Sequence, residues 1–260
     1  MTSQTIHVAI DERGVAQLTL ARPEKHNALS VEMIDALTEA AHDLGRNARV
    51  RVVVLAGEGA SFCAGGDLGW MRAQFDATRA GRIAEARRLA MLFKALNELP
   101  KPLLARVHGN AFGGGIGILS VCDMTIAAAT ARFGLTEVRL GIIPATISPY
   151  VIARIGEAHA RPLFLSGRII DAWQAHVAGL LSRVVPEDAL DEAVETEIRH
   201  FLVASPQAAA RAKALARSLG MPITDDVIDR VIEQLVEAWE SEEAREGLAA
   251  FFERRQPKWR

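Results

Sequence analysis

The chain has 260 residues, and its 30 Lys and Arg against 32 Asp and Glu give a formal net charge of −2. Half of the residues are hydrophobic and 24% are charged, which is typical of a soluble globular protein and excludes a disordered chain. The near-neutral charge argues against a nucleic-acid partner. The two cysteines, Cys63 and Cys122, exclude a disulfide framework and a thiolate metal cage and fit a reducing compartment.

The beginning of the chain lacks the basic and apolar regions of a secretory signal. The longest weakly polar stretch, Gly109–Cys122, has 14 residues and is rich in glycine, whereas a membrane helix needs about 20 apolar residues. We therefore expect a cytoplasmic protein without a membrane partner.

The first elements in chain order are a strand, a helix and a second strand. Val15–Leu20 alternates apolar and polar residues, as a half-buried strand does. Ser30 is a plausible N-cap for a helix in which Met33, Leu37, Ala41 and Leu44 recur at helical spacing. The run Val52–Leu55 is apolar throughout, which is typical of a parallel strand covered on both faces.

The same alternation continues in the middle of the chain. A helix is predicted over about Ile83–Leu99, where Pro100 follows and stops it. The strand Leu103–Val107, a glycine-rich turn with a helix start near Gly114, and the strand Met124–Ala128 come next. Strands that alternate with helices indicate the α/β class.

From about residue 188 onward helical patterns replace strands. Four helices are predicted, over 189–203, 206–219, 225–239 and 242–252. The apolar stripe of 225–239 is wider than a solvent-exposed helix needs, and either packing on its own domain or a subunit interface accounts for it. We therefore expect a core over residues 1–190 and a helical oligomerisation region over 191–260.

Two clusters of small residues follow predicted strands. Ser61–Leu68 contains Gly65 and Gly66, and, taken alone, it fits a tight turn or a place where another molecule approaches the backbone. His108–Gly117 contains three successive glycines at a predicted helix start. Free N–H groups at such a start favour an acceptor that carries negative charge.

Other glycine-rich and catalytic motifs are absent from the sequence. A dinucleotide fingerprint would require glycine where Ile118 stands, and no phosphate-binding loop ends in Gly-Lys-Ser/Thr. No Gly-x-Ser-x-Gly motif occurs, and no two of the seven histidines have metal-ligand spacing, so no metal site is expected. His26 and His108 fit surface or hydrogen-bonded residues better than catalytic ones.

In their order along the chain these clusters resemble the enoyl-CoA hydratase/isomerase (crotonase) family. The matching segments are Arg22–Leu29, Phe62–Leu68, Gly109–Gly117, Cys122-Asp123, Phe133–Glu137, Leu140–Pro144 and Glu246–Arg255. The resemblance implies an α/β fold of the ClpP/crotonase type, which is a spiral of ββα units, followed by a C-terminal helical trimerisation region. It also implies an assembly of three subunits or a dimer of trimers.

The resemblance further implies a thioester oxyanion hole formed by the backbone N–H groups of Gly66 and Gly114. Charge gathers on the carbonyl oxygen when a thioester becomes an enolate, and two fixed donors stabilise that charge. The acid–base carboxylate of the family corresponds to Glu137. Without the resemblance, Glu137 would fit a surface residue near a helix start.

Coenzyme A is expected as part of an acyl-CoA substrate, with no separate cofactor. By resemblance the contacts of coenzyme A fall on the turn Arg22–Leu29, on the backbone from Gly66 to Gly69 and on the C-terminal cation Arg254. Arg72 is a candidate partner for a substrate carboxylate. The residues expected to bind the substrate are Lys25, His26, Ala28, Ala64, Gly66, Asp67, Leu68, Gly69, Trp70, Gly114 and Arg254.

One position departs from the family pattern. Typical hydratases of the family carry a second glutamate where this chain has Gly117. An isomerase that moves a proton between Cα and Cγ needs a single base, so this loss favours 3-enoyl-CoA isomerisation. However, the segments Gly66–Met71 and Glu137–Ile152 resemble bacterial methylglutaconyl-CoA hydratases of leucine or isoprenoid breakdown, in which glycine here is compatible with hydration. We expect a hydratase, with an isomerase or a non-catalytic CoA- or RNA-binding protein as the alternatives.

Overall fold

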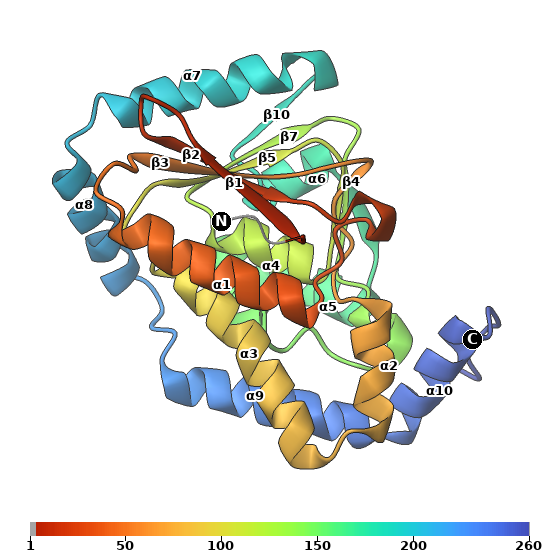
Figure 1. Ribbon diagram of the computed structural model, residues 1–260. Helices are drawn as coiled ribbons and strands as arrows, with labels where there is room; N and C mark the ends of the chain where they lie inside the picture. Colours follow the sequence, from red (N-terminus) through yellow and green to blue (C-terminus); the bar gives the residue numbers. More distant parts are fainter. Residues whose placement is uncertain (1–3, 260) are drawn as a thin grey trace.

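The computed structural model describes residues 4–259 and contains two β-sheets with helices around them (Figure 1). The strands are β1 (Ile6–Ile10), β2 (Val15–Leu20), β3 (Val52–Gly57), β4 (Ser61–Cys63), β5 (Leu103–Val107), β6 (Asn110–Phe112), β7 (Met124–Ala128), β8 (Arg132–Gly134), β9 (Ile169–Asp171) and β10 (Arg183–Val185). The α-helices are α1 (Val31–Arg46), α2 (Leu68–Asp76), α3 (Arg79–Asn97), α4 (Gly114–Val121), α5 (Ser148–Ser166), α6 (Ala172–Val177), α7 (Leu190–Leu202), α8 (Pro206–Ser218), α9 (Asp225–Glu240) and α10 (Glu242–Phe252). Short 3₁₀ turns are η1 (Pro23–Lys25), η2 (Glu137–Leu140) and η3 (Glu187–Ala189).

The two sheets are built from successive pairs of strands. The larger sheet has the order β1-β2-β3-β5-β7-β10, and the smaller one has the order β4-β6-β8-β9. The pairs β3–β4, β5–β6 and β7–β8 each give one strand to each sheet before the chain enters a helix. This arrangement is the predicted spiral of ββα units.

Helices cover both faces of the larger sheet (Figure 1). One face packs on α7, where Leu190, Val194 and Ile198 share a buried cluster with Val52 and Val54. The other face packs on α1 and α4 in the main core. Burial on both faces explains why the central strands contain continuous apolar runs.

The predicted N-cap of the first helix is confirmed, because the Ser30 hydroxyl accepts a hydrogen bond from the Met33 amide at 3.3 Å. The first turn of the next long helix differs from the prediction: α3 begins at Arg79, where Thr78 caps it, and the separate helix α2 precedes it.

The apolar stripe of α9 is buried within its own chain. Ile228, Ile232 and Val236 are at most 1% exposed and share a cluster with Ala86 and Ala90 of α3. In Figure 1 α9 runs beneath α3 and toward α2. Of the two sequence-based alternatives for this stripe, packing on its own domain is therefore the observed one.

Candidate active site

The loop that carries Gly66 is attached to the turn before α1. The Leu29 amide donates to the Gly65 carbonyl at 2.8 Å, and the Asp67 amide donates to the Leu29 carbonyl at 3.1 Å. These two hydrogen bonds use the carbonyl of Gly65 and the amide of Asp67, the residues on either side of Gly66, and leave out the Gly66 amide. In the part of the chain that the structure describes, the Gly66 N–H has no acceptor.

The second glycine cluster lies between β6 and α4. Gly113 caps α4 with φ +48°, a left-handed conformation that favours glycine, and its amide donates to the Gly134 carbonyl at 3.0 Å. Gly114 is the first residue of α4, so its N–H lies at the positive end of the helix dipole. Within residues 4–259 this N–H also has no acceptor.

The two glycine segments are in contact. A Cβ atom added to Gly113 or Gly114 would lie 3.7 or 3.9 Å from the Cα atom of Gly65. Gly66 and Gly114 also line one cavity together with Glu137. The three residues expected to carry the chemistry therefore lie around a common space.

The Glu137 carboxyl group lies over the second glycine segment. Glu137 is the first residue of η2, and its Oε1 atom is 2.9 Å from where a Cβ atom on Gly113 would lie. Its Oε2 atom is buried without a hydrogen-bond partner. Burial raises the pKa of Glu137 to about 7, against a smaller lowering by its own backbone N–H. A carboxyl group with this pKa can both accept and donate a proton near neutral pH.

An apolar cavity extends from this point between α1, α2 and α9. Glu137 is the one ionisable residue among its described lining residues. The sequence predicted Trp70 at the site but not the residues of α9. The wide apolar stripe of α9 was the one feature of the sequence that could have indicated its contribution to the cavity. The lining consists of Leu29, Ile34, Gly66, Trp70, Met71, Leu89, Gly114, Glu137, Ile142, Ile143, Pro144, Ala145, Thr146, Ile147, Leu235 and Trp239.

A second, more open cavity meets the first at Gly66, Met71 and Glu137. Among the predicted substrate contacts it includes Ala64, Gly66 and Leu68. The sequence did not predict two other lining residues, Arg139 of η2 and Phe251 of α10. The lining consists of Ala64, Gly65, Gly66, Leu68, Met71, Phe112, Gly113, Thr136, Glu137, Arg139, Leu140, Ile169 and Phe251.

Asp67 holds the start of α2. Its carboxylate accepts hydrogen bonds from the amides of Gly69 at 2.8 Å and Trp70 at 3.2 Å, and it forms an ion pair with Arg22 at 3.0 Å. Burial raises the pKa of Asp67, but the hydrogen bonds from Arg22 and from these amides lower it by more. The Arg22 guanidinium also donates to the Ala28 carbonyl at 2.7 Å. The turn before α1 and the Gly66 loop are thereby tied together.

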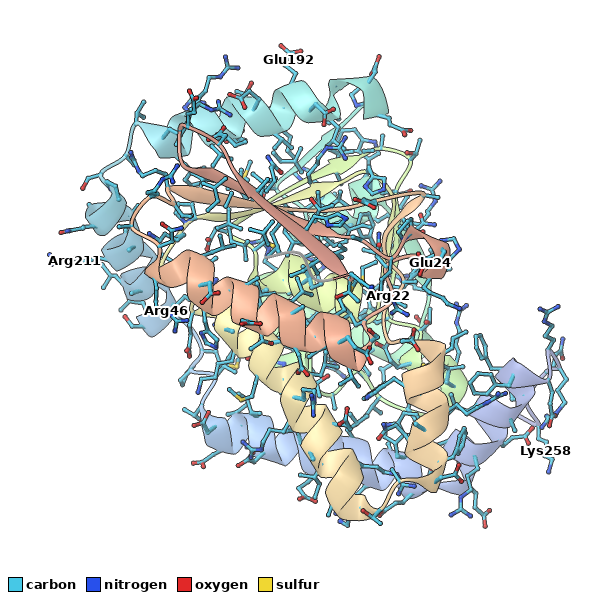
Figure 2. All side chains as sticks on the ribbon, viewed as in Figure 1. Arg22, Glu24, Arg46, Glu192, Arg211 and Lys258 are labelled. Carbon is cyan, nitrogen blue, oxygen red and sulfur yellow. The ribbon has the colours of Figure 1, made fainter. Side chains whose placement is uncertain are left out.

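Six predicted substrate contacts line neither cavity: Lys25, His26, Ala28, Asp67, Gly69 and Arg254. Lys25 is exposed on η1, and His26 contacts the Ser61 hydroxyl at 3.2 Å. Ala28 is buried, whereas Arg254 is exposed in the tail after α10. Figure 2 shows Lys258 of that tail at the tip of the C-terminal segment, apart from Arg22 and Glu24.

Two further residues singled out in the sequence, Arg72 and Gly117, line neither cavity. Arg72, the candidate partner for a substrate carboxylate, stacks on the Phe252 ring at 4.5 Å. At Gly117 a Cβ atom would lie 2.5 Å from Ile147 Cγ2 and 2.7 Å from Phe93 Cε1. Apolar side chains therefore fill the space that a second glutamate would need.

Among the described residues no cluster of three His, Cys, Asp or Glu side chains is arranged to hold a metal ion. The same residues contain no helix that is long and apolar enough to cross a membrane.

Known proteins resemble this chain over its full length. A family model described as enoyl-CoA hydratase/isomerase matches residues 11–260. A Mycobacterium bovis protein named a probable enoyl-CoA hydratase is 34% identical over 269 residues, which cover 100% of this chain and 99% of that protein.

Solved structures show the same similarity. An enoyl-CoA hydratase from Mycobacterium avium has a TM-score of 0.86 and 32% identity, with 100% of both chains covered. An enoyl-CoA hydratase from Shewanella pealeana has a TM-score of 0.81 and 38% identity, covering 98% of this chain and 96% of that one. The chain therefore belongs to the enoyl-CoA hydratase/isomerase (crotonase) family and is an enzyme of the hydratase kind.

Proposed function

We propose that the protein adds water across the 2,3 double bond of a 2-enoyl-CoA thioester. The observation that carries this proposal is the shared space of Gly66, Gly114 and Glu137, with two amides that have no acceptor and a buried carboxyl oxygen that has no partner. A thioester carbonyl that accepted from both amides would supply the missing acceptor. Its acyl chain would extend into the apolar cavity, and coenzyme A would leave through the open one.

In the first step the ionised Glu137 accepts a proton from water while the water oxygen forms a bond to Cβ. The π electron pair moves toward the thioester, whose carbonyl oxygen becomes an enolate oxygen between the Gly66 and Gly114 amides. Two fixed donors at this oxygen stabilise the charge, and loss of one typically costs about 3 kcal/mol. In the second step Glu137 returns the proton to Cα and is again ionised. These groups complete the reaction without a cofactor.

The lining of the apolar cavity supports a neutral acyl group. Its described residues include no cation, and Arg72 is engaged with Phe252. A substrate carboxylate would be buried there without a partner and close to Glu137, which is unfavourable. The sequence resemblance to methylglutaconyl-CoA hydratases predicts such a carboxylated substrate. We propose a neutral 2-enoyl group instead.

Isomerisation of a 3-enoyl-CoA is the second candidate. It is favoured by the single carboxylate of the site and by Phe93 and Ile147, which fill the space at Gly117. The same Glu137 would then take a proton from Cα and return one to Cγ.

One spectrophotometric assay separates these functions. Crotonyl-CoA, methylglutaconyl-CoA and a 3-enoyl-CoA are supplied in turn, and the absorbance of the conjugated thioester is followed. We expect a loss of absorbance with crotonyl-CoA and a much slower loss with methylglutaconyl-CoA. Rapid hydration of methylglutaconyl-CoA would contradict the neutral acyl group. A gain with the 3-enoyl-CoA would indicate isomerisation, and no change with any substrate would contradict catalysis.

The role of Glu137 is tested by Glu137→Gln. This substitution keeps the shape of the side chain but removes the proton carrier, so we expect hydration of crotonyl-CoA to fall by about 10²–10⁴-fold. The circular dichroism spectrum should be unchanged. A variant that hydrates crotonyl-CoA at the parental rate would show that Glu137 is not the acid–base group.

We also propose that the protein assembles as a trimer or a dimer of trimers. Large apolar side chains remain exposed at the ends of α7 and α8, and exposed apolar patches commonly mark interfaces. These side chains are Val203, Leu215, Leu219 and Met221. Light scattering gives the number of subunits, and a monomeric mass at micromolar concentration would contradict the proposal.

A further inference from the structure

Glu137 has no neighbour that orients its carboxyl group. Its Oε2 atom is buried without a partner, and no other residue in the described range donates a hydrogen bond to this side chain. The position of the carboxyl group therefore depends on the backbone of η2. The element that fixes η2 also determines where the carboxyl group lies.

Helix α10 packs directly on η2, and the contact is between backbones. At the end of η2, a Cβ atom on Gly141 would collide with the Glu243 carbonyl and would lie 2.7 Å from the Ala244 amide nitrogen. On α10, a Cβ atom on Gly247 would lie 2.5 Å from the carbonyl carbon and oxygen of Leu140. Real Cβ contacts are longer than these, so each contact requires glycine.

Apolar packing holds α10 in this place. Ala244 and Leu248 are fully buried and share a cluster with Ile142 and Trp239, which line the apolar cavity. On the outer side, Glu246 forms a bidentate pair with Arg255, at 2.6 and 3.0 Å. This pair turns the tail back over α10.

We propose that Gly247 is a positioning residue for Glu137: its missing side chain lets α10 lie against Leu140, and this contact fixes η2 and the carboxyl group that η2 carries. The inference rests on the proposed function, in which Glu137 moves the proton. Gly247 touches no reacting atom and acts through η2.

The test is the substitution Gly247→Ala in the full-length enzyme, with crotonyl-CoA as substrate. An added methyl group must push α10 away from Leu140, and a displacement of about 1 Å at a catalytic group can cost about 100-fold in rate. We expect kcat to fall at least 10-fold while KM changes by less than about 3-fold, because the contacts that bind the substrate remain. A parental kcat would overturn the inference.

Three controls separate positioning from other effects. Gly81→Ala makes the same change within α3, where a Cβ atom would meet nothing closer than 3.4 Å, and kcat should stay parental.

The second control concerns the tail. A Cβ atom on Gly247 would also lie 2.8 Å from Trp259, so Trp259→Ala is combined with Gly247→Ala. The double variant should remain slow, since Leu140 still blocks the methyl group, whereas recovery of kcat would assign the effect to the tail. Trp259→Ala by itself should be near parental.

Thermal stability provides the third control, because alanine has a higher helix propensity than glycine. An effect on helix propensity would raise the melting temperature without lowering kcat. If Gly247→Ala does not fold, Leu248→Ala loosens the same contact by leaving a cavity, and it should likewise lower kcat with little change in KM. Parental kcat in Leu248→Ala would then overturn the inference.

The outcome is distinguishable from failure of the proposed function. An active Glu137→Gln variant would refute Glu137 as the proton carrier. An inactive Glu137→Gln variant together with a parental Gly247→Ala variant would refute the positioning role of Gly247 and leave the proposed function intact.

Discussion

At the scale of a single residue, the burial of Glu137 opposes the ionisation that its proposed role requires. Its carboxyl group lies at the junction of two cavities, and it is buried without a partner for Oε2. Burial disfavours the ionised form and raises the pKa to about 7. The proposed reaction begins with the ionised form, so the enzyme must ionise a group in a place that resists ionisation.

This opposition predicts a pH-dependent effect of Glu137→Gln on stability. The folded-state pKa of Glu137 is raised, so its contribution to stability is fully present below the unfolded pKa of about 4.5 and is lost as the pH rises through about 7. Glutamine does not ionise. The parent should therefore lose stability between pH 4.5 and pH 8, and the variant should not lose this contribution. The free energy of unfolding of the variant minus that of the parent should rise by up to about 3 kcal/mol from pH 4.5 to pH 8. Urea unfolding at both pH values measures this, and a difference that does not change with pH would contradict it.

The neighbours of Gly117 leave no space for a side chain at this position. Phe93 and Ile147 occupy the space where a side chain would start, so Gly117→Ala overpacks the core. We expect the free energy of unfolding to fall by about 1–3 kcal/mol in a urea titration. Gly220→Ala is the matched control, because a Cβ there would lie 3.5 Å from its nearest atom. Equal stability of Gly117→Ala and the parent would show that the pocket can accept a side chain.

The sequence motifs identified the three residues that we propose to react, but they did not explain the side chains that surround Gly117. The motifs predicted Gly66, Gly114 and Glu137, and the structure brings these three to one cavity. The departure at Gly117 was visible in the sequence, but its cause was not. The contacts of Phe93 and Ile147 join segments far apart along the chain, and no local pattern encodes them.

At the scale of elements, the N-cap of α2 both stabilises this helix and lies next to the Gly66 amide of the proposed site. Asp67 caps α2 and pairs with Arg22, and Gly66 is the residue just before this cap. The side chains of Asp67 and Arg22 are each 17% exposed, so the pair is partly shielded from solvent. The direction of the Gly66 N–H therefore depends on a cap in the next residue.

Asp67→Ala should lower both stability and catalysis. Loss of the cap typically costs about 1 kcal/mol of unfolding free energy, and a misdirected Gly66 donor should lower kcat/KM for crotonyl-CoA at least 10-fold. Thr78→Ala is the control, since Thr78 caps α3 through the Gly81 amide but lines neither cavity. If both variants leave kcat/KM unchanged, the cap at Asp67 does not orient Gly66.

Long elements were predictable from the sequence, whereas the smaller sheet was not. Helices such as α1 and α9 run over four turns and display their period, so their existence followed from the pattern. The strands β4, β6, β8 and β9 have three residues each, which is too short to show alternation. They form because ββα geometry brings them side by side.

At the scale of the whole molecule, the C-terminal helices pack against the rest of the chain at several places. Helix α7 covers a sheet face, α9 packs on α3, and α10 packs on η2. The division at residue 190 stays a prediction, but α7 begins at this residue and shares a buried cluster with the central strands. A change from strand to helix patterns marks a change of secondary structure, and it does not by itself say which surfaces meet.

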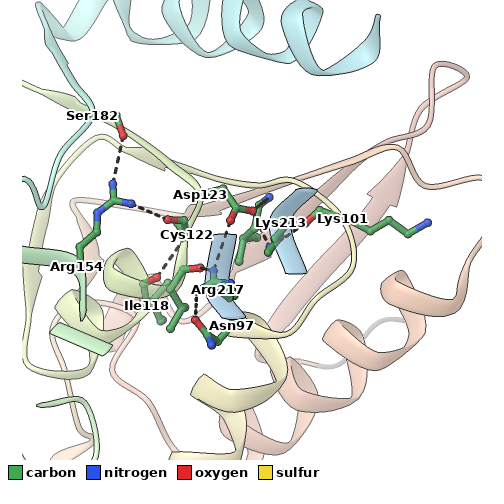
Figure 3. Close-up of polar contacts among 11 residues, drawn as sticks. Asn97, Lys101, Ile118, Cys122, Asp123, Arg154, Ser182, Lys213 and Arg217 are labelled. Carbon is green, nitrogen blue, oxygen red and sulfur yellow. Dashed lines mark hydrogen bonds and ion pairs between the residues drawn. The ribbon is translucent and has the colours of Figure 1, made fainter. Parts of the chain in front are cut away.

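Helix α8 is attached differently, through charges. None of its residues is buried as a whole, yet the Lys213 ammonium lies 2.6 Å from Asp123 Oδ2 and also donates to the Lys101 carbonyl (Figure 3). Arg217 pairs with the same carboxylate at 3.4 Å. Asp123 further accepts the Leu103 amide at 2.8 Å, so one carboxylate joins α8 to the first residue of β5.

Asp123→Ala should therefore destabilise the whole molecule. The substitution leaves the Lys213 side chain, which is 11% exposed, with a charge and no counter-charge, and breaking such a pair typically costs about 3–5 kcal/mol. Asp191→Ala removes an ion pair with Arg106 in which the aspartate is 80% exposed, and it should cost at most about 1 kcal/mol. Urea unfolding of both variants gives the comparison. Because Asp123 holds both α8 and β5, we expect one cooperative transition at lower urea; a separate early transition for α8 would show that the network secures that helix but not the sheet.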